Sequence, residues 1–359
     1  MSKLKIAIIG CGGIANEKQM PSLSKLDGIE MVAFCDLVEE RAEKAAAKYG
    51  VKEAQVYTDY KELLEKENLD VVHVCTPNKS HAEITIAALE AGNHVMCEKP
   101  MAKTASEARE MVDVAKRTGK KLTIGYNNRF RDDSLYMKDV CESGELGEVY
   151  FAKAHAIRRR AVPTWGVFLN EEEQGGGPLI DIGTHALDLT LWMMDNYEVK
   201  SVVGNVYHKL SGQESKANAF GPWDAKEFSV EDSAFGMITM KDGATVILES
   251  SWALNTLEVR EAQTTLCGTQ GGADMKDGLR INGEKHGKLH TTKPELGAGG
   301  VAFFDGELES DADREARLWI ESIVKDTEPV VKPEQALVVS EILEAIYESA
   351  KTGEAVYFD

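Results

Sequence analysis

Three side chains in the sequence have the chemistry needed to move a proton: Lys99, Asp181 and His185. Lys99 is followed by Pro100, which forces an extended backbone on the lysine and fixes the place of its ammonium. Partial burial lowers a lysine pKa, so Lys99 could share a proton with a substrate hydroxyl. On spacing alone, a solvated lysine explains this position more often than a catalytic one.

Asp181 and His185 follow Gly175-Gly176-Gly177-Pro178, a flexible loop with a proline that favours the start of a helix. In a helix, Asp181, His185 and Asp188 fall at i, i+4 and i+7 on one face. A histidine near its ordinary pKa accepts a proton from an alcohol at neutral pH, and Asp181 would hold a second hydroxyl or orient the histidine. Two other interpretations remain open: a packed helix with polar residues at its surface, and a metal site. Because no fourth ligand has clear spacing, we expect no metal.

A glycine-rich loop, Gly10-Cys11-Gly12-Gly13-Ile14-Ala15, stands between an apolar run and a helical pattern. It matches the dinucleotide fingerprint GxGxxG with alanine in the last place. Gly10 allows the tight turn, and Gly12 lets the backbone approach a pyrophosphate. The helix start at Gly13 and Ile14 supplies N–H donors. The alternative is a tight turn that binds nothing.

Asp36 ends the second apolar run, at the distance where an acid meets the ribose hydroxyls of the cofactor. A carboxylate there repels a 2′-phosphate, so we expect NAD as the cofactor. The residues after it offer no obvious phosphate clamp, although Arg41 could rotate in, which leaves NADP open. Asp36 could also cap the helix that begins at Glu39.

The elements that would position these residues alternate in the first third of the chain. The expected strands are Lys5–Ile9, Glu30–Cys35, Asp70–Cys75, Asn93–Cys97 and Lys121–Gly125. The expected helices between them are Glu39–Tyr49, Asp59–Glu67, Ser80–Ala91 and Ser106–Thr118. Short apolar runs separated by amphipathic helices predict an α/β fold with a doubly wound parallel sheet, the Rossmann arrangement. We assign residues 1–125 to this NAD(P)-binding domain.

After Tyr126 the pattern changes to one typical of an α+β domain, assigned to residues 126–359. Helical segments are expected at Ser134–Ser143, Pro178–Met194 and Pro333–Thr352. Strands are expected at Val149–Ile157, Val199–Tyr207, Ser233–Met240, Thr245–Trp252 and Arg260–Cys267. Consecutive antiparallel strands indicate a largely antiparallel sheet with one open face. The stretch from Asp274 to Gly300 is expected to form irregular loops, and the helix at 333–352 is a candidate to pack back on the first domain.

The motifs together resemble the Gfo/Idh/MocA oxidoreductase family. The similar segments are the glycine loop, Thr76-Pro77-Asn78 with His81, Glu98-Lys99-Pro100, Gly125-Tyr126-Asn127-Asn128-Arg129-Phe130, and Gly175–Asp188. The resemblance implies that Lys99, Asp181 and His185 form the catalytic set, with the histidine as base. It also implies a cis bond between Lys99 and Pro100, and homodimers or homotetramers built on the open face of the second sheet.

The resemblance also assigns binding residues. Thr76, Asn78, His81 and Glu98 would contact the cofactor, Lys99 would reach both cofactor and substrate, and Tyr126 and Asn128 would lie in the wall of the pocket. Arg158-Arg159-Arg160 and Trp165 lie where the second domain should approach the nicotinamide, and Arg158 and Trp165 are candidate substrate-binding residues. The arginines are either solvated around a structural tryptophan or a clamp for an acidic group.

Composition limits the remaining classes. The chain of 359 residues carries a formal charge of −19, which disfavours nucleic-acid and membrane partners. Its apolar start is too short for a signal peptide and the six cysteines form no CxxC pair, so we expect a cytoplasmic protein. The predicted function is hydride transfer between nicotinamide and a hydroxyl or keto carbon of a sugar, inositol or related polyol. A redox-neutral NAD-dependent glycoside hydrolase or eliminase and a non-catalytic NAD sensor remain alternatives.

Overall fold

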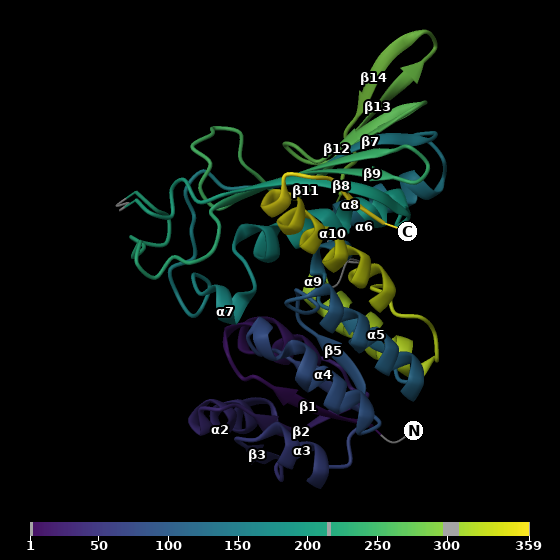
Figure 1. Ribbon diagram of the computed structural model, residues 1–359. Helices are drawn as coiled ribbons and strands as arrows, with labels where there is room; N and C mark the ends of the chain where they lie inside the picture. The colour runs from purple at the N-terminus through teal and green to yellow at the C-terminus, as the bar shows by residue number, and fades with distance from the viewer. Residues whose placement is uncertain (1–2, 214–216, 297–308, 359) are drawn as a thin grey trace. The chain divides into compact units, whose positions relative to one another are not determined.

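The computed structural model describes residues 3–213, 217–296 and 309–358. The chain divides into two compact units (Figure 1). Unit 1 comprises Met1–Asn127 and Glu309–Leu337, and unit 2 comprises Asn128–Leu308 and Val338–Asp359. The division drawn from the sequence left 309–337 in the second domain. This segment belongs to unit 1 because helix α9 (Asp311–Val324) buries Ala316, Trp319 and Ile320 in the same hydrophobic core as the first strands.

Unit 1 confirms the predicted doubly wound sheet. Within the described residues, six parallel strands lie in the order β3-β2-β1-β4-β5-β6. The strands are β1 (Leu4–Ile9), β2 (Ile29–Cys35), β3 (Gln55–Tyr57), β4 (Val71–Val74), β5 (His94–Cys97) and β6 (Leu122–Ile124). The other helical segments are η1 (Ala15–Gln19), α1 (Met20–Leu23), α2 (Glu39–Tyr49), α3 (Tyr60–Lys66), η2 (Asn78–Ser80), α4 (His81–Glu90) and α5 (Ala105–Thr118). The sequence did not indicate β3, a short edge strand of half-exposed residues with no apolar run.

Unit 2 confirms the second, mainly antiparallel sheet. Its described residues form nine strands in the order β14-β13-β12-β11-β7-β10-β9-β8-β15, in which β7 and β10 are the parallel pair. The strands are β7 (Val149–Ile157), β8 (Val199–Tyr207), β9 (Ser233–Met240), β10 (Thr245–Ser251), β11 (Arg260–Gly268), β12 (Gly271–Asp274), β13 (Arg280–Lys285), β14 (Lys288–Thr292) and β15 (Val356–Tyr357). The helical segments are η3 (Asn127–Phe130), α6 (Asp132–Glu142), α7 (Glu171–Gln174), η4 (Leu179–Gly183), α8 (Thr184–Met194) and α10 (Pro333–Thr352), whose first turn, through Leu337, belongs to unit 1.

The expectation of irregular loops from Asp274 onward is wrong for the β13–β14 hairpin. The turn of this hairpin places both His286 and Gly287 at positive φ, 53° and 69°, as tight hairpin turns require. The pattern gave no strand signal because β13 and β14 are mostly exposed and lack apolar alternation. Residues 297–300 of that prediction lie outside the described residues.

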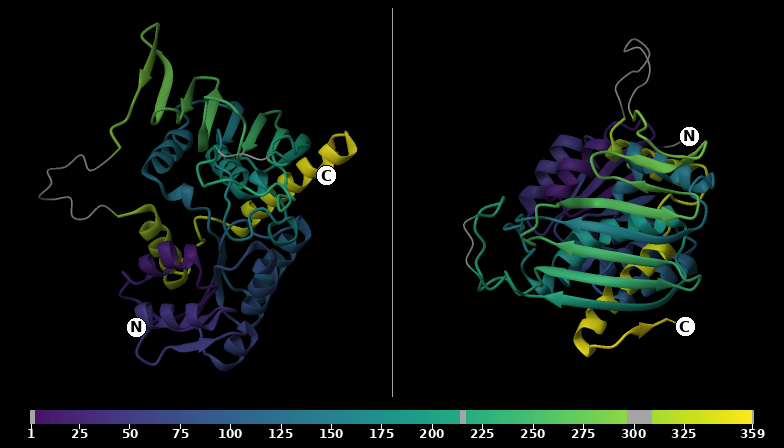
Figure 2. Two further views of the ribbon diagram at one scale, coloured as in Figure 1. Left: turned by 90° about the vertical axis from the view of Figure 1, so that its left-hand side faces the viewer. Right: turned by 90° about the horizontal axis from the view of Figure 1, so that it is seen from above.

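Helices cover one face of this sheet and leave the other open (Figure 2). Helix α10 approaches the strands closely at Gly204 and Gly236, where an added Cβ would lie 2.7 and 2.5 Å from the Ile346 side chain. Thr264 of β11 contacts Thr190 of α8 on the covered face. Its neighbour Thr265 therefore points to the open face.

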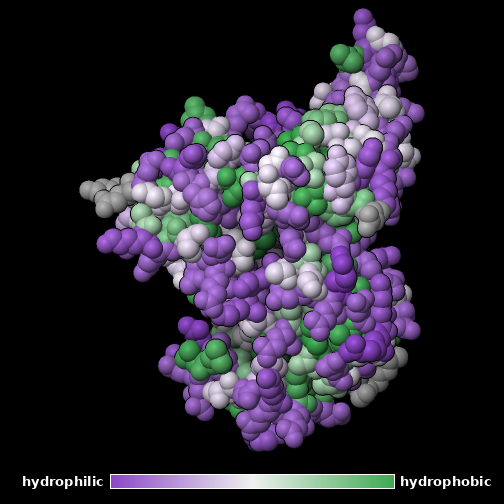
Figure 3. Space-filling model, in the orientation of Figure 1, coloured by the Kyte–Doolittle hydropathy of each residue, from purple (hydrophilic) through white to green (hydrophobic). Residues whose placement is uncertain are grey.

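Most of the surface seen in Figure 3 is hydrophilic, in keeping with the 28% of charged residues. In the described part of the chain, no helix is both long and apolar enough to cross a membrane.

Candidate active site

The glycine loop of unit 1 has one crowded glycine and two open ones. Gly10 has φ of +91°, and a Cβ there would lie 2.6 Å from the carbonyl carbon of Cys75, so only glycine fits. At Gly12 and Gly13 an added Cβ would meet nothing within 4 Å. Ile14, the next residue, is exposed. The loop thus packs against β4 on one side and presents open backbone at a helix start on the other, which fits a pyrophosphate.

Asp36 lies directly beside this loop at the end of β2. Its carboxylate accepts hydrogen bonds from the backbone N–H groups of Cys11 and Val38, each at 2.9 Å. The bond to Val38 lies in the turn before α2, whose N-cap residue is Val38 and has no side-chain cap, so Asp36 does not cap this helix. Arg41 lies 3.9 Å from the carboxylate, and its side chain is 60% exposed. The apolar side chain of Leu37 is almost fully exposed next to the acid, and it offers a contact for a flat adenine ring.

His81 connects two segments that lie at the ends of β4 and β5. Its Nδ1 lies 2.7 Å from the Pro100 carbonyl oxygen and its Nε2 lies 2.8 Å from the Thr76 carbonyl oxygen. Burial lowers the pKa of His81, but Cys97 and the two carbonyl groups together raise it to about 9. A charged imidazole that donates to both carbonyls fits this geometry. We therefore assign His81 a positioning role, in which it holds the Thr76 loop and the Pro100 turn in place.

Glu98 belongs to a buried charged cluster of unit 1. Its carboxylate accepts from the Gln19 amide at 2.7 Å and lies 3.5 Å from the Lys18 ammonium, which is 2.7 Å from Glu315 of α9. Burial opposes the charge on Glu98, but Lys18 and the Gln19 hydrogen bond lower its pKa below the ordinary value. Burial raises the pKa of Glu315. The carboxylate of the residue before Lys99 is thus held by two partners, Gln19 and Lys18.

Lys99 is half-buried, and its bond to Pro100 is cis, as the resemblance implies. Thr76 is half-buried, and its hydroxyl accepts a hydrogen bond from Ser80 at 2.8 Å. Asn78 is buried in η2, the 3₁₀ turn that follows β4. The cofactor residues expected from the sequence therefore gather at the carboxyl ends of β1, β2, β4 and β5, where doubly wound sheets bind ligands.

The helix that carries Asp181 and His185 in unit 2 begins with a π-helical turn, η4, and continues as α8. Such turns are frequent at functional sites. The buried carboxylate of Glu231 caps its start by accepting from the N–H groups of Gly177 and Leu179, at 2.7 and 3.0 Å. Both Asp181 and His185 are half-buried. The indole N–H of Trp252 donates to Asp181 at 3.0 Å and fixes the carboxylate.

Asp188 is buried, unlike the half-buried Asp181 and His185 of the same helical segment. The sequence placed it on the same helix face, but the π-helical turn shifts the phase of the pattern, and Asp188 is 1% exposed. Its carboxylate forms a two-point ion pair with Arg129, with distances of 2.6 and 2.9 Å. Asp188 thus anchors α8. Among the residues that the structure describes, no group of three His, Cys, Asp or Glu side chains is placed to hold a metal ion.

The residues expected to bind substrate occupy different environments. Tyr126 is buried in unit 1, and Asn128 is half-buried in unit 2. Arg158 pairs with Glu261 through two hydrogen bonds, at 2.6 and 2.5 Å, and also donates to the Ala161 carbonyl. Burial lowers the pKa of Arg158, but the hydrogen bonds and charge of Glu261 raise it above the ordinary value. The charge of Asp181 raises it further by a smaller amount. Trp165 is 53% exposed.

Five residues that position the site were missed from the sequence: Lys18, Glu315, Glu231, Trp252 and Arg129. The first four act on partners more than 50 positions away, and nothing in their own spacing marks them. Arg129 lies within one of the motifs of the resemblance, which was a usable signal.

Comparisons with known proteins decide the family. The model described as "Oxidoreductase family, NAD-binding Rossmann fold" matches residues 4–126, and the GFO/IDH/MocA C-terminal domain model matches residues 134–274. The D-glucoside 3-dehydrogenase of Escherichia coli (strain K12) is 38% identical over 99% of this chain and 97% of its own length. The chain belongs to the Gfo/Idh/MocA family. As a member of this family, the protein is an NAD-binding oxidoreductase that acts on CH–OH groups of sugars or polyols.

Other relatives of this Gfo/Idh/MocA protein agree with the assignment. The inositol 2-dehydrogenase of Salmonella typhimurium is 30% identical over 55% of this chain and 56% of its own length. Among solved structures, an oxidoreductase domain protein from Kribbella flavida is 25% identical, with a TM-score of 0.84 over the whole of both chains. Levoglucosan dehydrogenase in complex with NADH shares the fold at 21% identity, with a TM-score of 0.80 over the whole of both chains.

Proposed function

We propose that this protein is an NAD-dependent dehydrogenase that oxidises a ring hydroxyl of a D-glucoside or a related sugar or polyol to a ketone. The observation that carries the proposal is similarity along almost the whole chain to the D-glucoside 3-dehydrogenase, at 38% identity. The set Lys99, Asp181 and His185 supports it, because it offers a base, a cation and a fixed carboxylate for a hydroxyl substrate.

In the proposed reaction, His185 accepts the proton of the reacting hydroxyl, and Lys99 stabilises the oxygen as that proton leaves. The carbon gives up its hydrogen as a hydride and becomes a carbonyl. Asp181, held by the Trp252 indole, binds a neighbouring hydroxyl and orients the sugar ring. Bound NAD supplies the hydride acceptor.

The chain's own residues would hold this cofactor. The open backbone at Gly12 and Gly13 would receive the pyrophosphate. Asp36, next to the loop, would accept from the ribose hydroxyls and repel a 2′-phosphate. We therefore propose that NAD is preferred over NADP.

The first experiment measures nicotinamide absorbance with NAD and with NADP across a panel of glucosides, aldoses, inositols and sugar acids. We expect reduction of NAD by a glucoside. Lys99→Ala and His185→Ala should each abolish turnover and leave the affinity for NADH, measured by its fluorescence, nearly unchanged. Lys116→Ala, which changes an exposed lysine of α5, serves as the control.

Three results would contradict the proposal. Turnover at the wild-type rate in either variant would remove the residue from the catalytic set. Release of a sugar leaving group without net NADH would point to a redox-neutral glycoside hydrolase or eliminase. Binding of NAD without turnover of any panel member would point to a sensor.

We further propose that a second copy of the chain covers the open face of the unit 2 sheet. Val203 and Met237, 40% and 45% exposed, are register partners on β8 and β9, and Met237 is the partner of Ile247 on β10. An exposed apolar row of this kind is typical of an interface. Met237→Glu should lower the mass measured by light scattering, whereas Leu289→Glu on β14 should not. An unchanged mass in Met237→Glu would refute this interface.

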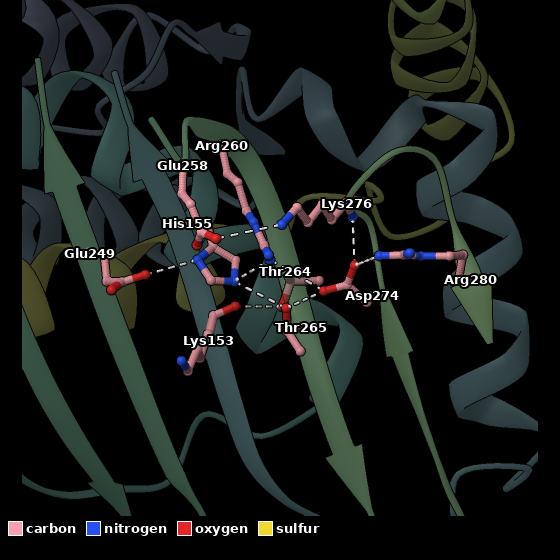
Figure 4. A network of polar contacts seen from close by, with 10 residues as sticks. All are labelled: Lys153, His155, Glu249, Glu258, Arg260, Thr264, Thr265, Asp274, Lys276 and Arg280. Atoms are coloured by element: carbon pink, nitrogen blue, oxygen red, sulfur yellow. Dashed lines mark hydrogen bonds and ion pairs between the residues drawn. The ribbon is translucent and has the colours of Figure 1, made fainter. Parts of the chain in front are cut away.

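A polar network lies beside this row on the same face (Figure 4). His155 contacts Glu249 and Thr265, each at 3.0 Å, and Asp274 accepts from Thr265 at 2.9 Å and from Arg280 at 2.7 Å. These bonds satisfy the polar groups within the chain, so the face could be covered without leaving them unpaired.

We propose a cytoplasmic location, which is supported by the cysteines. All six lie within the described residues and are free thiols.

A further inference from the structure

Unit 2 carries an exposed aromatic platform formed by Trp165 and Phe220. Their rings meet edge to face with centroids 4.8 Å apart, and they are 53% and 45% exposed. Large aromatic side chains normally bury most of their surface, so two that meet in solvent mark a surface prepared for a ligand.

Hydrogen bonds hold the two aromatic residues on one frame. The Asn218 side chain donates to the Val162 carbonyl at 2.8 Å and accepts from the Val162 N–H at 2.8 Å. The Thr164 hydroxyl donates to the Phe220 carbonyl at 2.5 Å. The loop before Trp165 and the loop before Phe220 are therefore joined, and the platform exists before any ligand arrives.

The platform is linked to Asp181 through two further ring contacts. The Phe168 ring lies 5.6 Å from Trp165 and 6.5 Å from Trp252, centroid to centroid. Trp252 is buried and donates its indole N–H to Asp181. A continuous series of ring contacts through Phe168 and Trp252 thus connects the platform to the residue that donates to Asp181.

The charges nearby do not suit an anionic group. Both outer edges of the Arg158 guanidinium are taken up by Glu261 and the Ala161 carbonyl. Arg160 donates to Asn255 at 3.1 Å. Arg158 and Arg160 are therefore engaged within the chain, and an uncharged ligand with a flat apolar face suits the two aromatic rings.

We propose that Trp165 and Phe220 form a subsite for the anomeric substituent of a glycoside, and that this substituent is itself a ring. The inference rests on the proposed function, because it takes Asp181 as the group that binds the oxidised sugar. A second pyranose offers its C–H face and an aryl group offers its π face, and both stack on aromatic side chains.

The test compares kcat/KM for phenyl glucoside and for a glucosyl disaccharide with kcat/KM for methyl glucoside, using both anomers and the full-length protein. We expect the ring-bearing substrates to be preferred about tenfold, which corresponds to ~1.4 kcal/mol. Trp165→Leu and Phe220→Leu should bring the preference close to one, and Trp165→Phe should keep most of it. Tyr150→Ala removes an aromatic side chain that is 54% exposed on β7, and it should leave the preference unchanged.

The two glycosides distinguish the kinds of ring. A preference for phenyl glucoside alone assigns the subsite to aryl groups, and a preference for the disaccharide alone assigns it to a second sugar. Methyl glucoside oxidised as well as both would overturn the subsite and leave the proposed function standing.

If no glucoside is oxidised, the proposed function fails, and tryptophan fluorescence tests the subsite separately. Phenyl glucoside should then change the emission of the wild type and not that of Trp165→Leu. An equal change in both would overturn the subsite. Circular dichroism confirms that each variant is folded, and Trp165→Phe tests the subsite should the leucine variants unfold.

Discussion

The ion pair between Arg129 and Asp188 should be worth far more than its two hydrogen bonds, because both side chains are buried. Their exposed fractions are 0% and 2%, and the guanidinium also lies 5.4 Å from the centre of the Trp192 ring. Replacing Asp188 with asparagine keeps the shape and leaves the Arg129 charge in the interior without its counter-charge. Removing one partner of such a pair typically costs about 3–5 kcal/mol.

A half-exposed pair in the same unit provides the control. Arg280 and Asp274 approach to 2.7 Å, close to the 2.6 Å of the buried pair, but their side chains are 37% and 21% exposed. Pairs that water can reach contribute roughly 0–1 kcal/mol. Arg280→Leu should therefore lower the free energy of unfolding by ~1 kcal/mol or less, and the double variant Arg129→Leu/Asp188→Leu should recover most of the loss seen in Asp188→Asn.

Urea denaturation followed by tryptophan fluorescence measures these changes. Four of the five tryptophans lie in unit 2, and Trp192 touches Arg129 directly, so the signal reports mainly on this unit. We also expect Asp188→Asn to lower kcat/KM, since α8 carries His185. A loss below 1 kcal/mol in Asp188→Asn, equal to that of Arg280→Leu, would refute the reasoning that burial sets the magnitude.

Three further predictions concern buried groups. Burial lowers the pKa of His73 from 6.5 to about 3, so between these pH values the unfolded chain binds a proton that the folded chain does not. The free energy of unfolding should therefore fall as pH drops from 6.5 towards 3, by up to ~1.4 kcal/mol per pH unit. His73→Leu should reduce this pH dependence, as measured by urea denaturation at each pH. His81 should have the opposite effect on the pH dependence of stability, because its pKa is raised to about 9. Its contribution to the free energy of unfolding is complete below pH 6.5 and is lost as pH rises through 9. His81→Gln should remove this loss at alkaline pH, and an unchanged dependence of stability on pH would contradict the assigned charge. Trp252→Phe removes the donor to Asp181, and a hydrogen bond to a charged group contributes ~1.5–3 kcal/mol, so kcat/KM should fall roughly 10- to 100-fold. Trp252 is fully buried, so the smaller ring should also lower thermal stability, and the kinetics are measured at a temperature where the variant is folded. Kinetics like those of the wild type would refute the positioning role.

Local patterns were sufficient for most of the fold. The helix at Glu39–Tyr49 and the strands Val149–Ile157 and Val199–Tyr207 have the bounds that periodicity predicts. Apolar spacing is a local property, because each side chain must face the core at every turn or every second residue. Edge elements such as β3 and the β13–β14 hairpin were not predicted, because they bury few side chains and therefore need no apolar pattern.

The sequence by itself was sufficient to predict the residue types of the candidate site. The glycine loop and Asp36 are predicted from local spacing, whereas the catalytic roles of Lys99, Asp181 and His185 are predictions from the family resemblance of their motifs. Backbone conformation and residue type suffice to recognise such motifs.

Only the tertiary structure decided how those residues are held. Glu98 is fixed by Lys18, 80 positions earlier in the chain, and Asp181 by Trp252, 71 positions later. Asp188, which the helical pattern grouped with Asp181, instead turns to Arg129 in the interior. Contacts of this range depend on which segments the fold brings together and on which charges it removes from water, and neither follows from local spacing.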